Sequence, residues 1–379
     1  MADVLTHIDT LDVEVAGQEE LDITVGSPME HSRVLPITKN GKHVVSDYDL
    51  ANVDVQPSLT DLTVTKNGSY LPKDYDADGF SKVDVNTDIP PFVSPLSDGS
   101  ITSTVSMFGY SKATKLDLRG LDVSNVTNMS RMFTESSVRE LNIDGWDTSK
   151  VIDMSRMFYG AQIEHLDLSH FDTSACKSMT SMFWATYPND AIDREIDAHY
   201  LNTSACTNMN GMFNGNYTRL DVRGFDTSNV TTFSSMFRYN LWDTIDLTSF
   251  RTTSCTNFAT MFQYCRFTTI DLTNFDCSNA VYVTNMFQFC SNAVSLCGDR
   301  TLDEITRGNI SILNGLKLSI DVSGSGFTKL NVQSMVALFN GVADLTGQAS
   351  KTITVGKTNL AKLTPEQIAI ATTKNWNII

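Results

Sequence analysis

One hydrophobic pattern recurs through the middle of the chain. Pairs of methionine and phenylalanine follow one another at intervals of 24 to 30 residues, and five of the seven intervals are 25 residues long. A fixed period of this length is the signature of a repeat array, in which each copy is one structural unit. The pairs begin at Met107, Met132, Met157, Met182, Met212, Met236, Met261 and Met286.

Each copy opens with an alternating apolar pattern. In the copy at 115–133, Leu116 and Leu118 are separated by one polar residue, which is the period of a strand with one buried face. A short strand is therefore expected at the start of each copy. The equivalent pairs in later copies are Leu141/Ile143, Leu166/Leu168, Leu220/Val222, Ile245/Leu247 and Ile270/Leu272.

The second half of each copy changes period. From Val126 to Phe133 the apolar residues follow the i, i+3, i+6, i+7 spacing of one helical face, after Asp122 and Ser124 as turn and N-cap residues. A strand, a turn, a short helix and a return are thus predicted. One copy alone cannot bury its apolar face, whereas stacked copies can. We predict an α/β solenoid of about eight 25-residue repeats, with a parallel sheet on one face and the Met-Phe pairs in its core.

The flanking segments have other patterns. Alternating strands are expected at 11–15 and 21–25, and two related units at 37–55 and 64–85 each carry an Asn-Gly pair, the signal of a tight hairpin. At the other end, Thr364 and Pro365 predict the start of a short helix. We divide the chain into 1–35, an N-terminal β segment; 36–89, two small Asn-Gly hairpin β modules; 90–295, the solenoid; and 296–379, a degenerate repeat and C-terminal cap.

Charge and hydropathy exclude some classes of function. The net charge of −16 and pI of about 4.7 disfavour binding to nucleic acid. No apolar run approaches the roughly 18–20 residues that span a bilayer, so membrane insertion is not expected. The N-terminal segment lacks a basic region followed by an apolar one, so no signal peptide is expected.

The sequence shows no pattern of residues typical of an enzyme. Six histidines are scattered, none beside a nucleophile motif, and no glycine-rich phosphate loop is present. Cys176, Cys206 and Cys255 occupy the place of Val126, so we interpret them as small buried hydrophobic residues rather than zinc ligands; a disulfide framework is the less favoured alternative. We predict no enzyme activity, no cofactor and no metal site.

A polar column is expected on the sheet. The position between the two buried strand residues holds Asp in six copies and Asn142 in another. Local hydrogen bonding is our preferred interpretation. The alternatives are a polar surface for a glycan or protein partner, a carboxylate pair that cuts a glycosidic bond, and a row of calcium sites. Like charges this close are expected to raise each other's pKa or to recruit cations or hydrogen-bond donors. The column comprises Asp117, Asp167, Asp197, Asp221, Asp246 and Asp271.

Aromatic residues that break the pattern are the preferred candidates for binding. They follow the Met-Phe pairs or lie in the long copy, where exposed rings would suit sugar faces or a protein partner. The alternative is that some of them fill gaps left by the irregular copy. The candidates are Trp184, Tyr187, Tyr200, Tyr239 and Trp242.

The repeat L-x-L-x-x-(L/F)-D-x-S-x-V-x-x-M-x-x-M-F, over about residues 90–292, is similar to that of BspA-like leucine-rich-repeat surface proteins. The resemblance implies a right-handed, leucine-rich-repeat-like coil on a bacterial or phage surface protein that binds a host or partner surface. The units at 37–55 and 64–85 resemble modules near the front of virion proteins from phages of Gram-positive bacteria. The segment 338–379 is similar to the closing segment of phage tail or fibre proteins.

These resemblances favour a non-enzymatic phage virion surface protein, such as a head fibre, capsid-decorating fibre or tail receptor-binding protein. Its N-terminal β region would attach to other virion proteins, and its solenoid would bind a host glycan or protein. A homo-oligomer such as a trimer is expected. Virions assemble in the host cytoplasm, which fits the expected lack of a signal peptide. A bacterial BspA-like adhesin is the main alternative, and a polysaccharide-degrading spike is the least favoured one.

Overall fold

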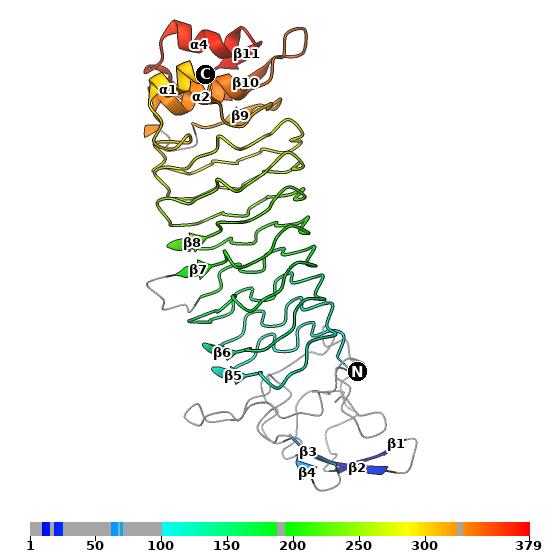
Figure 1. Ribbon diagram of the computed structural model, residues 1–379. Coiled ribbons are helices and arrows are strands. Elements are labelled where there is room, and N and C mark those ends of the chain that lie inside the picture. The colour runs from blue at the N-terminus through cyan, green and yellow to red at the C-terminus, as the bar shows by residue number, and fades with distance from the viewer. Residues whose placement is uncertain are drawn as a thin grey trace, which may run out of the picture. The chain divides into compact units, whose positions relative to one another are not determined.

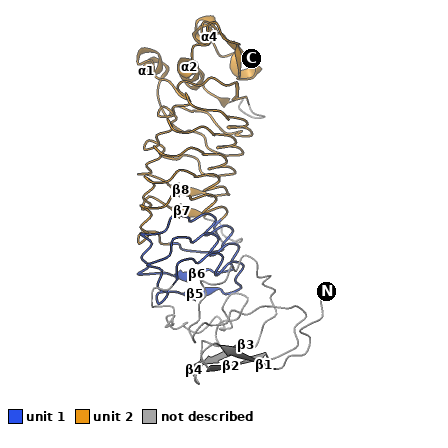
Figure 2. Cartoon of the chain, turned by 90° about the vertical axis from the view of Figure 1, so that its right-hand side faces the viewer, with its two compact units in different colours: residues 1–166, 186–189 blue, residues 167–185, 190–379 orange. Residues whose placement is uncertain are grey.

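The structure is a computed structural model. It describes residues 10–15, 19–25, 62–66, 69–70, 101–187, 194–323 and 329–379. The chain divides into two compact units, which Figure 2 shows in different colours. The first unit comprises residues 1–166 and 186–189, and the second comprises 167–185 and 190–379.

In the N-terminal region, the described residues form an antiparallel sheet of four strands in the order β1-β2-β3-β4. The strands are β1 (Thr10–Val15), β2 (Glu19–Val25), β3 (Leu62–Lys66) and β4 (Ser69–Tyr70). β3 and β4 pair on either side of Asn67-Gly68, where the sequence predicts a hairpin. Because β2 pairs with β3, the sheet joins the segments 1–35 and 36–89 that the sequence pattern separates. The first Asn-Gly pair, at 40–41, lies outside the described residues.

Short parallel strands mark successive copies of the repeat (Figure 1). In the first unit, β5 (Lys115–Asp117) pairs with β6 (Glu140–Asn142), and Leu116 lies opposite Leu141. In the second unit, β7 (Glu195–Asp197) pairs with β8 (Arg219–Asp221), and Asp197 lies opposite Asp221. Equivalent residues therefore lie side by side in neighbouring copies, as stacking requires.

The Met-Phe segments are not helices, and this part of the sequence prediction is wrong. Within residues 101–187 and 194–297 the structure contains no α-helix. The residue directly before each methionine of the eight pairs has a positive φ, between 52° and 61°, so the backbone turns into the left-handed region and a helix cannot continue. These residues are Ser106, Arg131, Arg156, Ser181, Gly211, Ser235, Thr260 and Asn285.

Backbone hydrogen bonds explain the apolar spacing without a helix. The N–H groups of Met129, Arg131 and Phe133 donate to the carbonyls of Asp153, Ser155 and Met157 in the next copy, at 2.8 to 2.9 Å. The intervening amides of Met132 and Thr134 close local turns by donating three residues back. Alternate amides thus bind the neighbouring copy, so the segment forms a second parallel ladder between copies.

The core of each unit is a column of Met-Phe side chains. The methionines from Met132 to Met261 and their phenylalanines are 0 % exposed. In the first unit, Phe133 stacks on Phe108 and Phe158, with ring centroids 5.5 Å apart in both pairs. In the second unit, a stacked series runs through Phe183, Phe213, Phe237, Phe262 and Phe287, with centroids 5.5 to 6.2 Å apart.

All seven cysteines lie in the described ranges, are buried and form no disulfide. Cys206 and Cys255 occupy the apolar position before a Met-Phe pair, and burial raises the pKa of these thiols to about 11 and about 12. The interpretation of these cysteines as small buried hydrophobic residues is confirmed.

Helices occur at the C-terminal end of the second unit, where α1, α2 and α4 are grouped (Figure 1). α4 begins at Pro365 with Thr364 as its N-cap, as the sequence predicts. β9, β10 and β11 form a parallel sheet in the order β11-β10-β9. The elements are α1 (Leu302–Arg307), β9 (Ile320–Asp321), α2 (Val332–Gly341), β10 (Lys351–Thr354), α3 (Lys357–Leu360), α4 (Pro365–Thr372) and β11 (Trp376–Ile378).

The right-handed, leucine-rich-repeat-like solenoid stays a proposal, because parallel pairing between copies does not by itself give the handedness of a coil. In the segment 296–379, which is expected to be a degenerate repeat and cap, Leu338 and Phe339 are buried in α2. None of the helices in the described ranges is long and apolar enough to cross a membrane.

Candidate functional site

Each aspartate of the column makes a local hydrogen bond. Asp117, Asp197 and Asp221 are the last residues of β5, β7 and β8, whereas the strands expected around Asp167, Asp246 and Asp271 are not formed. One carboxylate oxygen of each Asp accepts the backbone N–H of the residue two positions later, at 2.8 to 3.3 Å. Asn142 accepts the N–H of Asp144 in the same way, at 3.2 Å. Aspartate and asparagine are favoured here because their short side chains reach this amide and turn the chain after the strand. The pairs are Asp117–Arg119, Asp167–Ser169, Asp197–His199, Asp221–Arg223, Asp246–Thr248 and Asp271–Thr273.

Hydrogen bonds lower the pKa of four members of the column. The pKa values of Asp117 and Asp221 are lowered mainly by hydrogen bonds from the side chains of Arg119 and Arg223. Ser169 lowers the pKa of Asp167 in the same manner. For Asp271, partial burial raises the pKa, but bonds from Arg300 and Thr273 outweigh it. These four carboxylates recruit donors, and their pKa values are not raised by their neighbours.

We expect the column to make folding sensitive to acid. Because the folded pKa values are depressed, the stability they contribute is present above the unfolded Asp pKa of about 3.9 and is lost as the pH falls through the lower folded values. Urea midpoints measured from pH 5 to pH 2 should therefore decrease below about pH 4, and Asp221→Asn should reduce this decrease. A midpoint that does not change over this range would contradict the interpretation.

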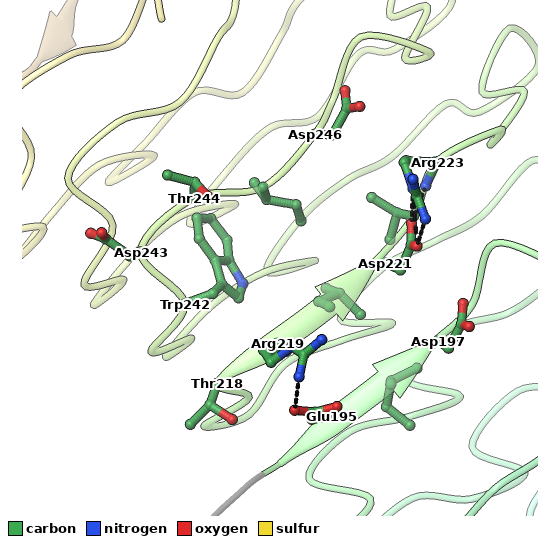
Figure 3. Close-up of a pocket in the computed structure, with 14 residues that line it drawn as sticks. Glu195, Asp197, Thr218, Arg219, Asp221, Arg223, Trp242, Asp243, Thr244 and Asp246 are labelled. Atoms are coloured by element: carbon green, nitrogen blue, oxygen red, sulfur yellow. Dashed lines mark hydrogen bonds and ion pairs between the residues drawn. The ribbon is translucent and has the colours of Figure 1, made fainter.

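A shallow depression of about 600 Å³ lies on the sheet face of the second unit. Three successive copies line it, with residues from 195–197, 218–223 and 242–246. Five carboxylates and two guanidinium groups are distributed along its lining (Figure 3). The side chain of Arg219 donates to Glu195 at 2.7 Å, and Arg223 binds both carboxylate oxygens of Asp221 at 2.5 to 3.0 Å.

The five aromatic candidates do not form one exposed edge. The expectation of exposure is wrong for Trp242, which is only 2 % exposed because its indole stacks on Phe267 and meets the edge of Phe237. Tyr200 is 50 % exposed and lies beside His199 at the end of β7. Tyr187 is half-buried in the first unit, and Trp184 is half-buried in the second.

Tyr239 belongs to an exposed aromatic ladder that the sequence reasoning missed in part. Its ring stacks on Tyr264 at 4.8 Å, and Tyr264 stacks on Phe289 at 4.6 Å. Arg238 lies over the Tyr239 ring, 4.5 Å from its centroid. All three rings follow the phenylalanine of a Met-Phe pair by two residues, so their 25-residue spacing could have identified the ladder.

One group of metal-ligating side chains comes together among the described residues. Asp197, His199 and Asp221 have ligand atoms that all lie within 4.8 Å of one another. The sequence pattern predicts Asp197 and Asp221 in the column but does not indicate His199, because His199 lies 22 positions before Asp221 in the sequence. Only the parallel register of β7 and β8 brings the three together.

Comparisons with known proteins gave one family. A family model described as "Mycoplasma protein of unknown function, DUF285" matches residues 102–197 and 189–297. The two overlapping matches cover more than half of the 379 residues. No curated protein and no solved structure matches the chain.

Proposed function

We propose that this chain, which belongs to the family described as "Mycoplasma protein of unknown function, DUF285", is a non-enzymatic surface protein that adheres to a host or partner surface through its repeats. The family is associated with BspA-like repeats, so this part of the sequence resemblance is confirmed. The assignment to a phage particle goes beyond the family match. In our proposal the chain is a virion head fibre, capsid-decorating fibre or tail receptor-binding protein.

The state of the aspartate column supports adhesion over hydrolysis. A carboxylic acid that protonates a glycosidic oxygen needs a raised pKa. The pKa values of Asp117, Asp167, Asp221 and Asp271 are lowered, and each side chain is engaged by a donor two residues later. These carboxylates are suited to holding turns and presenting acceptor oxygens, which favours binding.

The depression and the aromatic ladder are the two surfaces we propose for adhesion. In the depression, carboxylates can accept from sugar hydroxyls or peptide amides, while Arg219 and Arg223 can donate. On the ladder, the exposed rings of Tyr239 and Tyr264 offer apolar area close to the charge of Arg238. Both surfaces suit a host glycan or protein.

The N-terminal β region is the proposed attachment to other virion proteins. Two features support this role. The region has its own antiparallel sheet, and the Asn-Gly units at 37–55 and 64–85 resemble modules of phage virion proteins. Assembly as a homo-oligomer, such as a trimer, is part of the proposal. A bacterial BspA-like adhesin remains the alternative, and the family assignment fits both.

Immunogold electron microscopy tests the location. Antibody raised against residues 101–297 should label virions purified from a lysate of the bacterium whose genome carries the coding sequence. Label on the head would indicate a head fibre or decoration protein, and label at the tail tip a receptor-binding protein. Label confined to the bacterial envelope, with virions unlabelled, would refute the phage proposal in favour of the bacterial adhesin.

A further inference from the structure

We propose that Asp197, His199 and Asp221 form a binding site for a divalent transition-metal ion of the zinc class. The proposal does not depend on the adhesive function. The two carboxylates lie on the neighbouring parallel strands β7 and β8, directly opposite each other in register. His199 follows Asp197 in the turn after β7, where its backbone N–H donates to that same carboxylate.

The three side chains converge on one point. His199 Nδ1 contacts Asp197 Oδ1 and lies 3.9 Å from Asp221 Oδ2. Two ligands bound at about 2.0–2.2 Å to one zinc ion lie up to roughly 4 Å apart. Small side-chain rotations therefore suffice to place an ion among the three ligand atoms, which fall within 4.8 Å of one another. One imidazole and two carboxylates suit zinc, whereas calcium prefers oxygen ligands alone.

Arg223 is compatible with this site, although it is a nearby positive charge. It donates to both oxygens of Asp221 from its Nε and Nη2 atoms. With the backbone N–H of Arg223 also bound to Oδ1, each oxygen of Asp221 accepts two hydrogen bonds, so an ion would replace one of them. Ligating carboxylates are commonly held by such an outer hydrogen bond, which fixes their orientation. Arg223 therefore positions Asp221, and it also makes the site weaker than one without a neighbouring cation.

The adjoining depression gives the proposed site access to a partner. Asp197 and Asp221 both line it. A metal ion with three protein ligands keeps an open position, which an oxygen from water or from an adhering partner would fill.

The repeat supplies a natural control for this proposal. His170 stands in a neighbouring copy at a similar turn, and its Nδ1 lies 3.7 Å from Asp167 Oδ2. No group of three ligand atoms is formed there by the described residues. Substitution of His170 therefore removes a more exposed imidazole without touching the proposed site.

Titration of the full chain with zinc chloride alone, followed by calorimetry, tests the site. We expect one binding event that His199→Ala weakens by at least about tenfold, with a similar loss in Asp197→Asn, and that His170→Ala leaves unchanged. Near-ultraviolet circular dichroism would check that each variant keeps the native fold. With cobalt as the probe, the visible absorption of a bound ion should be lost in His199→Ala and kept in His170→Ala.

Two results would overturn the proposal. One is the absence of zinc binding by the native chain, and the other is equal affinity in the native chain and in folded His199→Ala. Neither result bears on where the protein resides on a particle, so the immunogold experiment and this titration fail independently.

Discussion

Phe237→Ala is expected to destabilise the second unit by about 3–5 kcal/mol, the range for removing a buried phenylalanine. The Phe237 ring is 0 % exposed. It stacks on Phe213 and Phe262 in the copies on either side, and it meets Trp242 edge-on at 6.1 Å. Truncation therefore leaves a cavity that reaches three successive copies. Thermal unfolding followed by circular dichroism should show a melting temperature lower by roughly 10 °C.

Tyr239→Ala is the matched control for this substitution. It removes another aromatic ring two residues away, but the Tyr239 side chain is 38 % exposed and leaves no enclosed cavity. We expect a much smaller change in melting temperature. An unchanged melting temperature in Phe237→Ala would refute the role of the Met-Phe column as the core.

Gly341→Ala is expected to disrupt the packing of α2 against the preceding segment. A Cβ at this position would lie 2.0 Å from the backbone oxygen of Ile312 and 3.0 Å from its carbonyl carbon. Neither atom is the end of a flexible side chain, so the backbone itself must move. Overpacking of this kind costs about 1–3 kcal/mol and at times more, and we expect the upper end of this range. The hydrogen bond from Gly315 N–H to Gly341 O, now 2.8 Å, would be lost as α2 moves away.

Hydrogen exchange would locate the effect of Gly341→Ala. The amides of Ile312 and Gly315 should exchange faster, whereas those between copies at 206–263 should keep their protection. Gly347→Ala is a suitable control, because a Cβ there meets nothing within 4 Å and the only cost is a positive φ of 80°, about 1–2 kcal/mol. Equal protection of Ile312 in the native chain and in Gly341→Ala would contradict the predicted clash.

The sequence predicted which residues are buried better than it predicted their backbone. Val126, Met129, Met132 and Phe133 are all buried, as their spacing indicates. The same spacing arises from a helix or from consecutive turns, and pattern alone does not separate the two. Arg131 decides the outcome through its positive φ of 59°, which no side-chain preference of arginine reveals. The stacking between copies supports this conformation, because its amide then reaches Ser155 O at 2.9 Å.

The candidate sites were predictable where the repeat register was used and were missed where residues were considered singly. The aspartate column follows from the alternation of apolar and polar residues at the start of each copy. In the structure its members make the local hydrogen bonds that the sequence analysis favours over the other interpretations. The ring type of Trp242 suggests a binding residue, but its position three residues before Ile245 matches buried Ala113 and Phe267 and indicates burial. Tyr264 and Phe289 were omitted, although they repeat the position of Tyr239.

The ladders between copies have a mechanical consequence. Within each unit, the amides of the Met-Phe segments bind the next copy rather than their own, as Phe213 N–H does with Met236 O at 3.0 Å. A force that pulls neighbouring copies apart therefore acts on the hydrogen bonds of one ladder at a time. The copies should unfold one after another. Each released copy of 25 residues adds roughly 80–90 Å of extended chain. A chain built in this way would lengthen in steps under a pulling force and absorb work at each step.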